Sequence, residues 1–492
     1  MTTRPSRPRI GRGARPGRPP RAREPRVSDV PGAGQILELE IGPVAHGGHC
    51  VARHEGRVVF VRHTLPGERV RARVTSTGSR YWRADAVEIL DPSPDRVPAA
   101  WPAAGPGGVG GGELSHVALP AQRRWKADVV ADQLRRIARY DGPLLDGLTV
   151  EAAPGDDAAG GLAYRTRIDL VADDDGHLGM HRFRSHDVVA LDPLPDGMPL
   201  ATDEVAELAA AEAVFTRRWR PGTRVELVAP AGAEGGEPLV LADGEPWHRG
   251  RADTRPNARR AVKETVVARL PGADEPSTFA YRVGASGFWQ VHRAAPGLLV
   301  QAVLDAAGPV AGATVLDLYS GAGLFTLPLA AAVGETGTVV AVEGDAGAVR
   351  DARRNAHGLN QVRLFAGDVA EVLAGSGPEA GRAGRAGTPA PGGGEQAGSG
   401  DAVEPRPDGG TVPGKVDVVV LDPPRAGAKR EVTAAVVDLD PARVVYVACD
   451  PAALARDVGY FGQAGYRLTS LRAFDLFPHS HHVEAVAVLE RG

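Results

Sequence analysis

A cysteine near the end of the chain stands where chemistry could use a thiol. Cys449 is one of only two cysteines among 492 residues, and it follows the apolar run 444–448, which predicts a buried strand. Pro451 then opens a predicted amphipathic helix over residues 452–460. The positive end of a helix dipole favours a thiolate, whereas the neighbouring Asp450 opposes it. A lone cysteine is also often a small buried hydrophobe, so the thiol by itself leaves both interpretations open.

A Gly-rich turn lies about 130 residues before this thiol. Residues 315–326 are typical of a strand, a turn containing Gly321 and Gly323, and the start of a helix. Glycines at such a turn let a ligand approach the backbone closely. Glu343 ends the next predicted strand, about twenty residues past the glycines, where a carboxylate can accept hydrogen bonds from ribose hydroxyls. Gly-x-Gly alone is weak evidence, because dinucleotide-binding folds use the same geometry.

Three details favour S-adenosylmethionine over NAD as the ligand of this turn. An acid, Asp317, lies within the first strand just ahead of the glycines. Position 326 is Thr, so the third glycine of the fuller dinucleotide pattern is absent. Finally, the segment 422–425, Asp-Pro-Pro-Arg, follows the fourth predicted strand.

These polar residues share one position in the predicted fold. Ligands of open α/β sheets bind beyond the carboxyl ends of the strands. Five candidate site residues lie at or near such ends: Asp317, Glu343, Asp368, Asp422 and Cys449. This convergence is stronger evidence than any single motif, although an Asp before two prolines, such as Asp422, is often only a turn former or helix cap.

The elements that must position these residues alternate between strand and helix from about residue 285 onward. This alternation predicts a parallel α/β sheet. The expected strands cover residues 314–318, 338–343, 362–366, 416–421, 443–448, 467–474 and 483–489. A Gly-, Ala-, Pro- and Arg-rich insertion over about 376–414 interrupts them and predicts a disordered surface loop.

The region 35–90 predicts a small β-barrel, with short strands over 36–41, 57–62, 69–75 and 84–89 separated by Gly and Pro turns. Its polar positions are rich in arginine, with Tyr81 and Trp82 interleaved: Arg53, Arg57, Arg62, Arg69, Arg71, Arg73, Arg80 and Arg83. Basic groups beside stacking aromatics suit single-stranded nucleic acid. A plain barrel with a solvated arginine face fits the composition equally well.

The remaining segments are less informative. Residues 1–34 form an Arg/Pro/Gly-rich tail that we expect to be disordered; residues 1–26 carry nine arginines and one acid, Glu24. Residues 92–112 are typical of a linker, and residues 119–140 predict a helix. The region 147–283 mixes strand-like runs with loops and shows no catalytic motif.

Bulk properties exclude several classes of protein. The net charge of −4 does not by itself indicate a nucleic-acid binder, and no apolar run is long enough to span a bilayer. Two cysteines cannot form a disulfide framework or hold a metal cluster unaided, so we expect a reducing, cytoplasmic location and no metal site. Nothing in the sequence demands more than a monomer.

Taken together, these motifs resemble the RNA uracil-C5 methyltransferases, which make 5-methyluridine in tRNA and rRNA. The matching segments are 35–90 (the RNA-binding TRAM domain), 288–292 (Phe-Phe-Gln-Val-Asn in the family), 317–325 (the Gly-rich motif), 422–425 (Asp-Pro-Pro-Arg), 448–451 (the nucleophile motif) and 482–484 (His-x-Glu). The resemblance covers most of the chain.

The resemblance implies a fold and domain order. We expect a Rossmann-like class I S-adenosylmethionine-dependent methyltransferase sheet over residues 285–492. An OB-like TRAM barrel over 35–92 would precede it, together with a linker, a helix and a mixed α+β central RNA-binding domain over 93–284. The expected partner is tRNA or rRNA, and the expected cofactor is S-adenosylmethionine.

The resemblance also implies residue roles. Gln290, Tyr319, Glu343 and Asp422 would line the cofactor and uracil site, beside Asp317, Gly321, Gly323 and Asp368. Cys449 would be the nucleophile and Glu484 the general base; as a simpler alternative, Glu484 is an exposed carboxylate at a strand start. His482 receives no role.

This chain departs from the family pattern at four places. Ala448 and Asp450 replace the usual Ser and Asn around the nucleophile, which can alter the pKa of the thiol. His292 replaces Asn. Where many members carry Cys-Gly-Gly-Cys for an iron–sulfur cluster, this chain has Gly-Gly-Gly-Glu-Leu over 110–114, so we predict no cluster.

The implied chemistry is covalent catalysis. Thiolate addition to C6 makes uracil C5 nucleophilic enough to take a methyl group, after which a base removes the C5 proton and the thiol leaves. A flipped-out target base is required. The alternatives are a cytosine-C5 or base-nitrogen RNA methyltransferase, a non-catalytic RNA-binding protein that kept the fold and, more distantly, a nicotinamide dehydrogenase.

Overall fold

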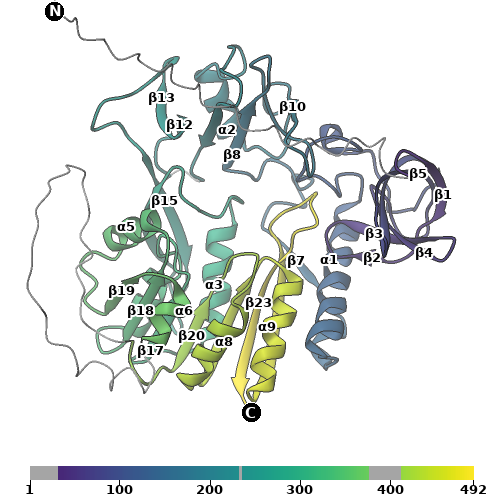
Figure 1. Ribbon diagram of the computed structural model, residues 1–492. Helices are drawn as coiled ribbons and strands as arrows, with labels where there is room; N and C mark the ends of the chain where they lie inside the picture. Colours follow the sequence, from purple (N-terminus) through teal and green to yellow (C-terminus); the bar gives the residue numbers. More distant parts are fainter. Residues whose placement is uncertain (1–31, 232–234, 376–411) are drawn as a thin grey trace, which may run out of the picture.

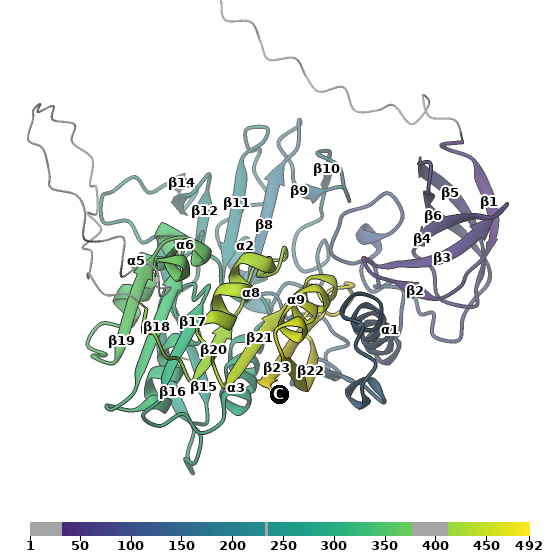
Figure 2. The same cartoon turned by 60° about the horizontal axis from the view of Figure 1, so that its bottom comes forward.

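The computed structural model describes residues 32–231, 235–375 and 412–492. It shows a barrel, a central sheet and a larger mixed sheet covered by helices on both faces (Figures 1 and 2). Most of the predicted tail and of the predicted insertion lies outside these residues.

The barrel is a single curled six-stranded sheet in the order β1-β5-β6-β4-β3-β2. Its strands are β1 (Ile36–Glu40), β2 (Val44–Ala45), β3 (His49–His54), β4 (Arg57–Arg62), β5 (Arg69–Thr77) and β6 (Tyr81–Asp91). Alternate residues such as Leu37, Val59 and Val70 point inward and are buried, as period-2 patterning requires. Strand β3 was not predicted, because His49 and Arg53 interrupt its apolar alternation; Cys50 nevertheless packs in the barrel core.

The segment predicted as a linker is packed rather than loose. Trp101 is fully buried in the core of the central domain and donates a hydrogen bond from Nε1 to the Gly197 carbonyl at 2.9 Å. Helix α1 (Leu119–Gln133) follows and ends in a π-helical turn, Leu134–Ala138. The predicted helix therefore exists but stops before Arg139, which adopts a left-handed conformation.

The central sheet has the order β10-β9-β8-β11-β12-β13-β14, and its paired strands are antiparallel. Its elements are β8 (Arg167–Ala172), β9 (Leu178–His181), β10 (Val188–Ala190), α2 (Asp203–Ala211), β11 (Arg224–Val228), β12 (Leu239–Ala242), β13 (Glu245–His248) and β14 (Arg251–Ala252). Strand β10 is the strand of this sheet nearest the barrel (Figures 1 and 2).

The large sheet has the order β19-β18-β17-β20-β21-β23-β22-β7. Its strands are β7 (Val150–Ala152), β17 (Thr314–Leu318), β18 (Thr338–Glu343), β19 (Val362–Ala366), β20 (Val418–Leu421), β21 (Arg443–Ala448), β22 (Tyr466–Asp475) and β23 (Glu484–Arg491). The expectation of a parallel sheet holds except for β23, which is antiparallel to both neighbours. Strand β7 lies before the predicted boundary at residue 285, yet it extends this sheet beside β22.

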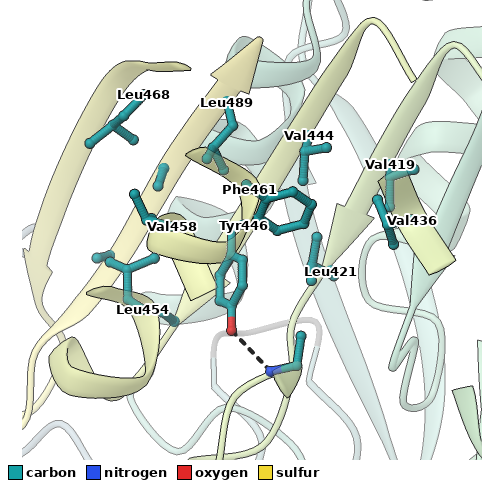
Figure 3. Close-up of a cluster of buried hydrophobic side chains, with 14 of the residues drawn as sticks. Val419, Leu421, Val436, Val444, Tyr446, Leu454, Val458, Phe461, Leu468 and Leu489 are labelled. Carbon is teal, nitrogen blue, oxygen red and sulfur yellow. Dashed lines mark hydrogen bonds between the residues drawn. The ribbon is translucent and has the colours of Figure 1, made fainter. Parts of the chain in front are cut away.

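Apolar side chains bury both faces of the sheet, as a largely parallel sheet requires. One face is covered by α1, α6 (Val369–Ala374), α8 (Lys429–Asp438) and α9 (Pro451–Gln463). The other is covered by α3 (Ala295–Ala307), α4 (Thr326–Val333) and the hairpin of β15 (Ala261–Ala268) and β16 (Ser277–Gly284), with α5 (Ala346–Asn355) beside β16. Leu454, Val458 and Phe461 of α9 pack toward Tyr446 and Leu489 of the sheet (Figure 3).

Candidate active site

The carboxyl edge of the large sheet gathers most of the predicted site residues. Asp422 and Cys449 each come directly after a parallel strand, β20 and β21, and Glu343 ends β18. Glu484 begins the antiparallel strand β23, so it lies at the same edge. Because Ala448 pairs with Ala485, the register brings the next residue, Cys449, opposite Glu484.

The Gly-rich turn after β17 has the backbone that a ligand-binding loop needs. Tyr319, Gly321 and Gly323 all have positive φ values, of 63°, 57° and 93°. The backbone N–H of Gly321 donates to Oε2 of Glu343 at 2.8 Å, and the N–H of Asp345 donates to Oε1 at 2.6 Å. Glu343 therefore braces the turn, and each of its oxygens keeps a lone pair for a ligand hydroxyl.

Two carboxyl groups lie close to this turn, Asp317 fully buried and Asp422 half-buried. Asp317 is fully buried and accepts a hydrogen bond from the Thr326 hydroxyl, but its Oδ1 has no partner among the described residues. Burial raises the pKa of Asp317 to about 7, and burial together with the Asp317 carboxylate raises the pKa of Asp422 to about 7. A cationic or hydrogen-bonding ligand would relieve this accumulation of acids.

The Cys449 thiol is half-buried, and its environment does not favour the thiolate. Burial, followed by the negative charges of Glu484 and Asp422, raises the pKa of Cys449 to about 12; only Arg425 acts in the opposite direction. The sequence set the α9 dipole, which favours a thiolate, against Asp450, which opposes it; in the structure Asp450 is one of the groups that raise the pKa, and burial together with the other acids acts in the same direction.

Glu484 is buried, with 3% of its surface exposed, so it is not an exposed carboxylate at a strand start. Burial and the neighbouring Asp422 raise its pKa well above the ordinary value, and Arg425 partly offsets them. Arg425 also lies 3.3 Å from His482, measured from Nη2 to Nε2. Arg425 is thus a cation of the site; it belongs to the Asp-Pro-Pro-Arg motif, but nothing in the sequence indicated this role.

Asp450 links the site to the barrel, which sequence reasoning missed. Its Oδ1 caps α9 by accepting from the Ala453 N–H at 2.8 Å, and its Oδ2 lies 3.2 Å from Nε2 of His46 in the β2–β3 turn. The residue beside the nucleophile is therefore tied to a domain about 400 residues earlier in the chain.

The other predicted residues lie around this centre. Gln290 is buried, and its neighbour Trp289 packs with Ala322 and Phe325 of the Gly-rich turn. Asp368 caps α6 through Oδ1, and its charge is one cause of the raised pKa of Tyr319. His292 is buried against Asp156 at 2.9 Å, so it holds the chain between domains rather than facing the thiol.

Within the described ranges, no group of three or more His, Cys, Asp or Glu could hold a metal ion. No helix in that part of the chain is long and apolar enough to cross a membrane.

The sheet order, the Gly-rich turn and the edge acids define a Rossmann-like class I methyltransferase fold. Comparisons with known proteins agree. Residues 33–87 match the TRAM domain model, and residues 414–492 match the model of tRNA (Uracil-5-)-methyltransferase.

Relatives match over nearly the whole chain. Proteins named "Uncharacterized RNA methyltransferase" from Streptomyces avermitilis and Streptomyces coelicolor are 42% and 41% identical, covering 93% and 95% of this chain and 98% and 95% of their own. A crystal structure of the Pyrococcus abyssi tRNA (uracil-54, C5)-methyltransferase with S-adenosyl-L-homocysteine shares the fold at a TM-score of 0.57 and 21% identity, covering 92% of this chain and all of its own. The chain belongs to the RNA uracil-C5 methyltransferase family.

Proposed function

We propose that this protein transfers a methyl group from S-adenosylmethionine to C5 of a uridine in tRNA or rRNA, with Cys449 as nucleophile and Glu484 as base. The observation that carries the proposal is the register of β21 and β23, which sets the only half-exposed thiol opposite a buried carboxyl group. A thiol for C6 and a base for the C5 proton are the two groups that this reaction needs.

The residues at the sheet edge fit the cofactor. Gly321 and Gly323 leave the turn without side chains, and the unpartnered Oδ1 of Asp317 and the free lone pairs of Glu343 offer acceptors. Tyr319, Gln290, Asp368 and Asp422 would complete the site. When bound, S-adenosylmethionine supplies an electrophilic methyl group.

The protein's own groups would then act in sequence. Once its proton has passed to solvent, the Cys449 sulfur would form a bond to C6, and the electron pair of the C5–C6 double bond would make C5 the nucleophile that takes the methyl group, with S-adenosylhomocysteine as the leaving group. Glu484 removes the C5 proton, and the sulfur–C6 bond breaks to restore the double bond. Arg425 lowers the pKa values of Cys449 and Glu484. It therefore favours the thiolate and the carboxylate, the two forms that the reaction uses.

Surface features near the site support a nucleic-acid substrate. Phe288, two residues before Gln290, is 76% exposed. A cavity of about 460 Å³ lies beside it, lined by Arg165 and by the ion pair of Arg224 with Asp169. An exposed aromatic ring beside an arginine suits base stacking. The proposal also includes a cytoplasmic location, which the two free cysteines support because free thiols fit a reducing compartment. The proposed oligomeric state is a monomer.

Nucleoside mass spectrometry on tRNA and rRNA, incubated with the protein and labelled S-adenosylmethionine, tests the proposal. We expect labelled 5-methyluridine, which Cys449→Ala abolishes while the affinity for S-adenosylmethionine persists. Label in 5-methylcytidine or an N-methylated base would favour the alternative enzymes, and turnover by Cys449→Ala would exclude covalent catalysis. Cofactor binding without any methylated product would indicate a binding protein that kept the fold.

A further inference from the structure

Gln290 is buried, yet the protein does not fix its side chain directly. Within the described residues the Gln290 amide makes no hydrogen bond. On one side of it, Trp289 packs with Ala322 and Phe325 of the Gly-rich turn. The direction of the amide therefore depends on how the backbone on the other side, at residues 291–293, is held.

The backbone after Gln290 is held by residues 164–166, which run antiparallel to residues 291–293. The Val291 carbonyl accepts two hydrogen bonds from Thr166, one from the N–H at 2.8 Å and one from the hydroxyl at 3.1 Å. These bonds fix the path of the chain, and the side chain at position 292 supplies a further contact.

His292 is a fully buried side-chain anchor at this point. Its Nδ1 accepts a hydrogen bond from the Ala294 N–H at 3.0 Å, so the ring proton is on Nε2. Nε2 lies 2.9 Å from Oδ2 of Asp156 and donates to it. Both ring nitrogens are thus used, which leaves His292 no nitrogen for proton transfer to a substrate and indicates a positioning role.

The Asp156 carboxylate is buried with little compensation. Its Oδ1 makes no hydrogen bond in the described part of the chain, and Nη2 of Arg293 lies 3.9 Å from it. Burying a carboxylate is unfavourable unless it is paired and hydrogen-bonded. Proteins keep such unfavourable arrangements mainly at functional sites. The side-chain hydrogen bond that Asp156 does make is the one to His292.

Tyr164 connects this pair to the other half of the site. Its ring stacks on the His292 ring, with 4.9 Å between centroids and 20° between planes. Its hydroxyl donates to the Pro478 carbonyl at 3.2 Å, and Pro478 lies in the loop between β22 and β23, shortly before Glu484. The hydrogen-bonded pair therefore lies between the segment of Gln290 and the loop that leads to the proposed base.

We propose that Asp156 and His292 are positioning residues for the cofactor, because their hydrogen bond holds the backbone at residue 292 and so directs the Gln290 amide. The inference rests on the proposed function, in which Gln290 lines the cofactor site, and deepens it by naming two residues that act through a third. Asp156 follows β7, which joins the large sheet from outside the predicted methyltransferase domain. The cofactor site thus depends on a segment that lies before residue 285.

The affinity of the full chain for S-adenosyl-L-homocysteine, measured by calorimetry, tests this inference. Asp156→Ala removes the acceptor for the Nε2–H of His292 and should weaken binding about fivefold to tenfold. Asp156→Asn keeps an acceptor there and should retain most of the affinity. Asp157→Asn is the matched control: Asp157 is the next residue, its side chain is exposed, and the variant should bind as the wild type does.

A double-mutant cycle separates positioning from a purely structural role. If Asp156 acts through Gln290, Asp156→Ala should have little further effect on affinity in a Gln290→Ala background. Amide exchange at residues 290–292 in the absence of cofactor gives a second readout, and it should accelerate in Asp156→Ala but not in Asp157→Asn. Additive losses of affinity, or wild-type affinity in Asp156→Ala, would overturn the inference.

A second variant keeps the test decisive if Asp156→Ala does not fold. Asp156→Leu/His292→Phe replaces both partners by apolar side chains, so neither is left as an unpaired buried polar group. It should fold and show the same loss of affinity, and wild-type affinity in it would also overturn the inference. A wild-type protein that binds S-adenosyl-L-homocysteine but methylates no RNA would overturn the proposed function alone; one that does not bind it would overturn both.

Discussion

At the scale of single residues, the acids around Cys449 set the pKa of the thiol. Asp450, which stands where the family usually has Asn, is one of the groups that raise it. Asp450→Asn removes this charge but keeps a side-chain oxygen for the α9 cap. We expect the pKa of Cys449 to fall, and below that pKa the rate of alkylation scales with the thiolate fraction. A fall of half a unit would make alkylation about threefold faster.

The measurement is the pH dependence of alkylation in a Cys50→Ala background, in which Cys449 is the one thiol that can react. Asp438→Asn, at the far end of α8, is the control for net charge. An unchanged or raised pKa in Asp450→Asn would show that the helix cap or the His46 contact, rather than the charge, governs the thiol.

Glu484 permits a second prediction at this scale. Gln has the shape of Glu but cannot accept the C5 proton, so Glu484→Gln should stop the reaction after methyl transfer with Cys449 still bonded to C6. We expect a covalent protein–RNA complex that survives denaturing electrophoresis. The double variant Cys449→Ala/Glu484→Gln must lack it, and the absence of any complex in the single variant would count against Glu484 as the base.

At the scale of elements, one buried carboxylate holds the loop after β20 against α9. Asp457 of α9 accepts hydrogen bonds from the Tyr446 hydroxyl and the Ala428 N–H, both at 2.7 Å. The Tyr446 hydroxyl also accepts from the Ala428 N–H at 3.2 Å (Figure 3). The loop that carries Asp422 and Arg425 therefore depends on this contact with the helix that follows Cys449.

Tyr446→Phe should loosen the loop without dismantling the sheet. The variant loses both hydrogen bonds of the hydroxyl, the one donated to Asp457 and the one accepted from Ala428, which together are worth about 1–2 kcal/mol, so amide exchange near Ala428 should accelerate roughly fivefold to thirtyfold. Tyr460→Phe is the control, since Tyr460 lies on α9, the helix of Asp457, and its hydroxyl makes no hydrogen bond within the described residues. Equal amide exchange near Ala428 in the two variants would show that the hydrogen bond from Ala428 to Asp457 is enough to hold the loop.

At the scale of the whole molecule, a buried ion pair joins the N-terminal half to the large sheet. Lys126 of α1 and Asp475 of β22 are 0% and 1% exposed, and Nζ lies 2.5 Å from Oδ1. Lys126 also donates to the Phe477 carbonyl at 3.0 Å. Removing one partner of such a pair leaves an uncompensated buried charge.

Lys126→Met should therefore destabilise the protein by about 3–5 kcal/mol. Thermal unfolding measures the effect. Arg124, on the same helix as Lys126, forms an exposed pair with Asp95, and Arg124→Met should cost less than about 1 kcal/mol. Lys126→Met/Asp475→Leu should recover much of the loss. Similar melting of Lys126→Met and the wild type would show that water or a neutral Asp475 compensates.

The sequence by itself determined the elements whose signal is local. Strands β17, β18 and β21 have the bounds that their apolar runs predict, because a strand buried on both faces is a continuous hydrophobic segment ended by polar or turn residues. The convergence of Asp422, Glu343 and Cys449 at one edge followed from the same rule. The family was indicated by the resemblance of several motifs, above all the nucleophile motif at 448–451 and Asp-Pro-Pro-Arg at 422–425.

Only the tertiary structure decided what surrounds these groups. The antiparallel direction of β23 sets Glu484 opposite Cys449, and burial together with Asp422 raises both pKa values. The pairing of His46 with Asp450 joins residues about 400 positions apart. Propensity and periodicity act over a few neighbouring residues, whereas desolvation and charge depend on every atom within several ångströms, and those atoms come from distant parts of the chain.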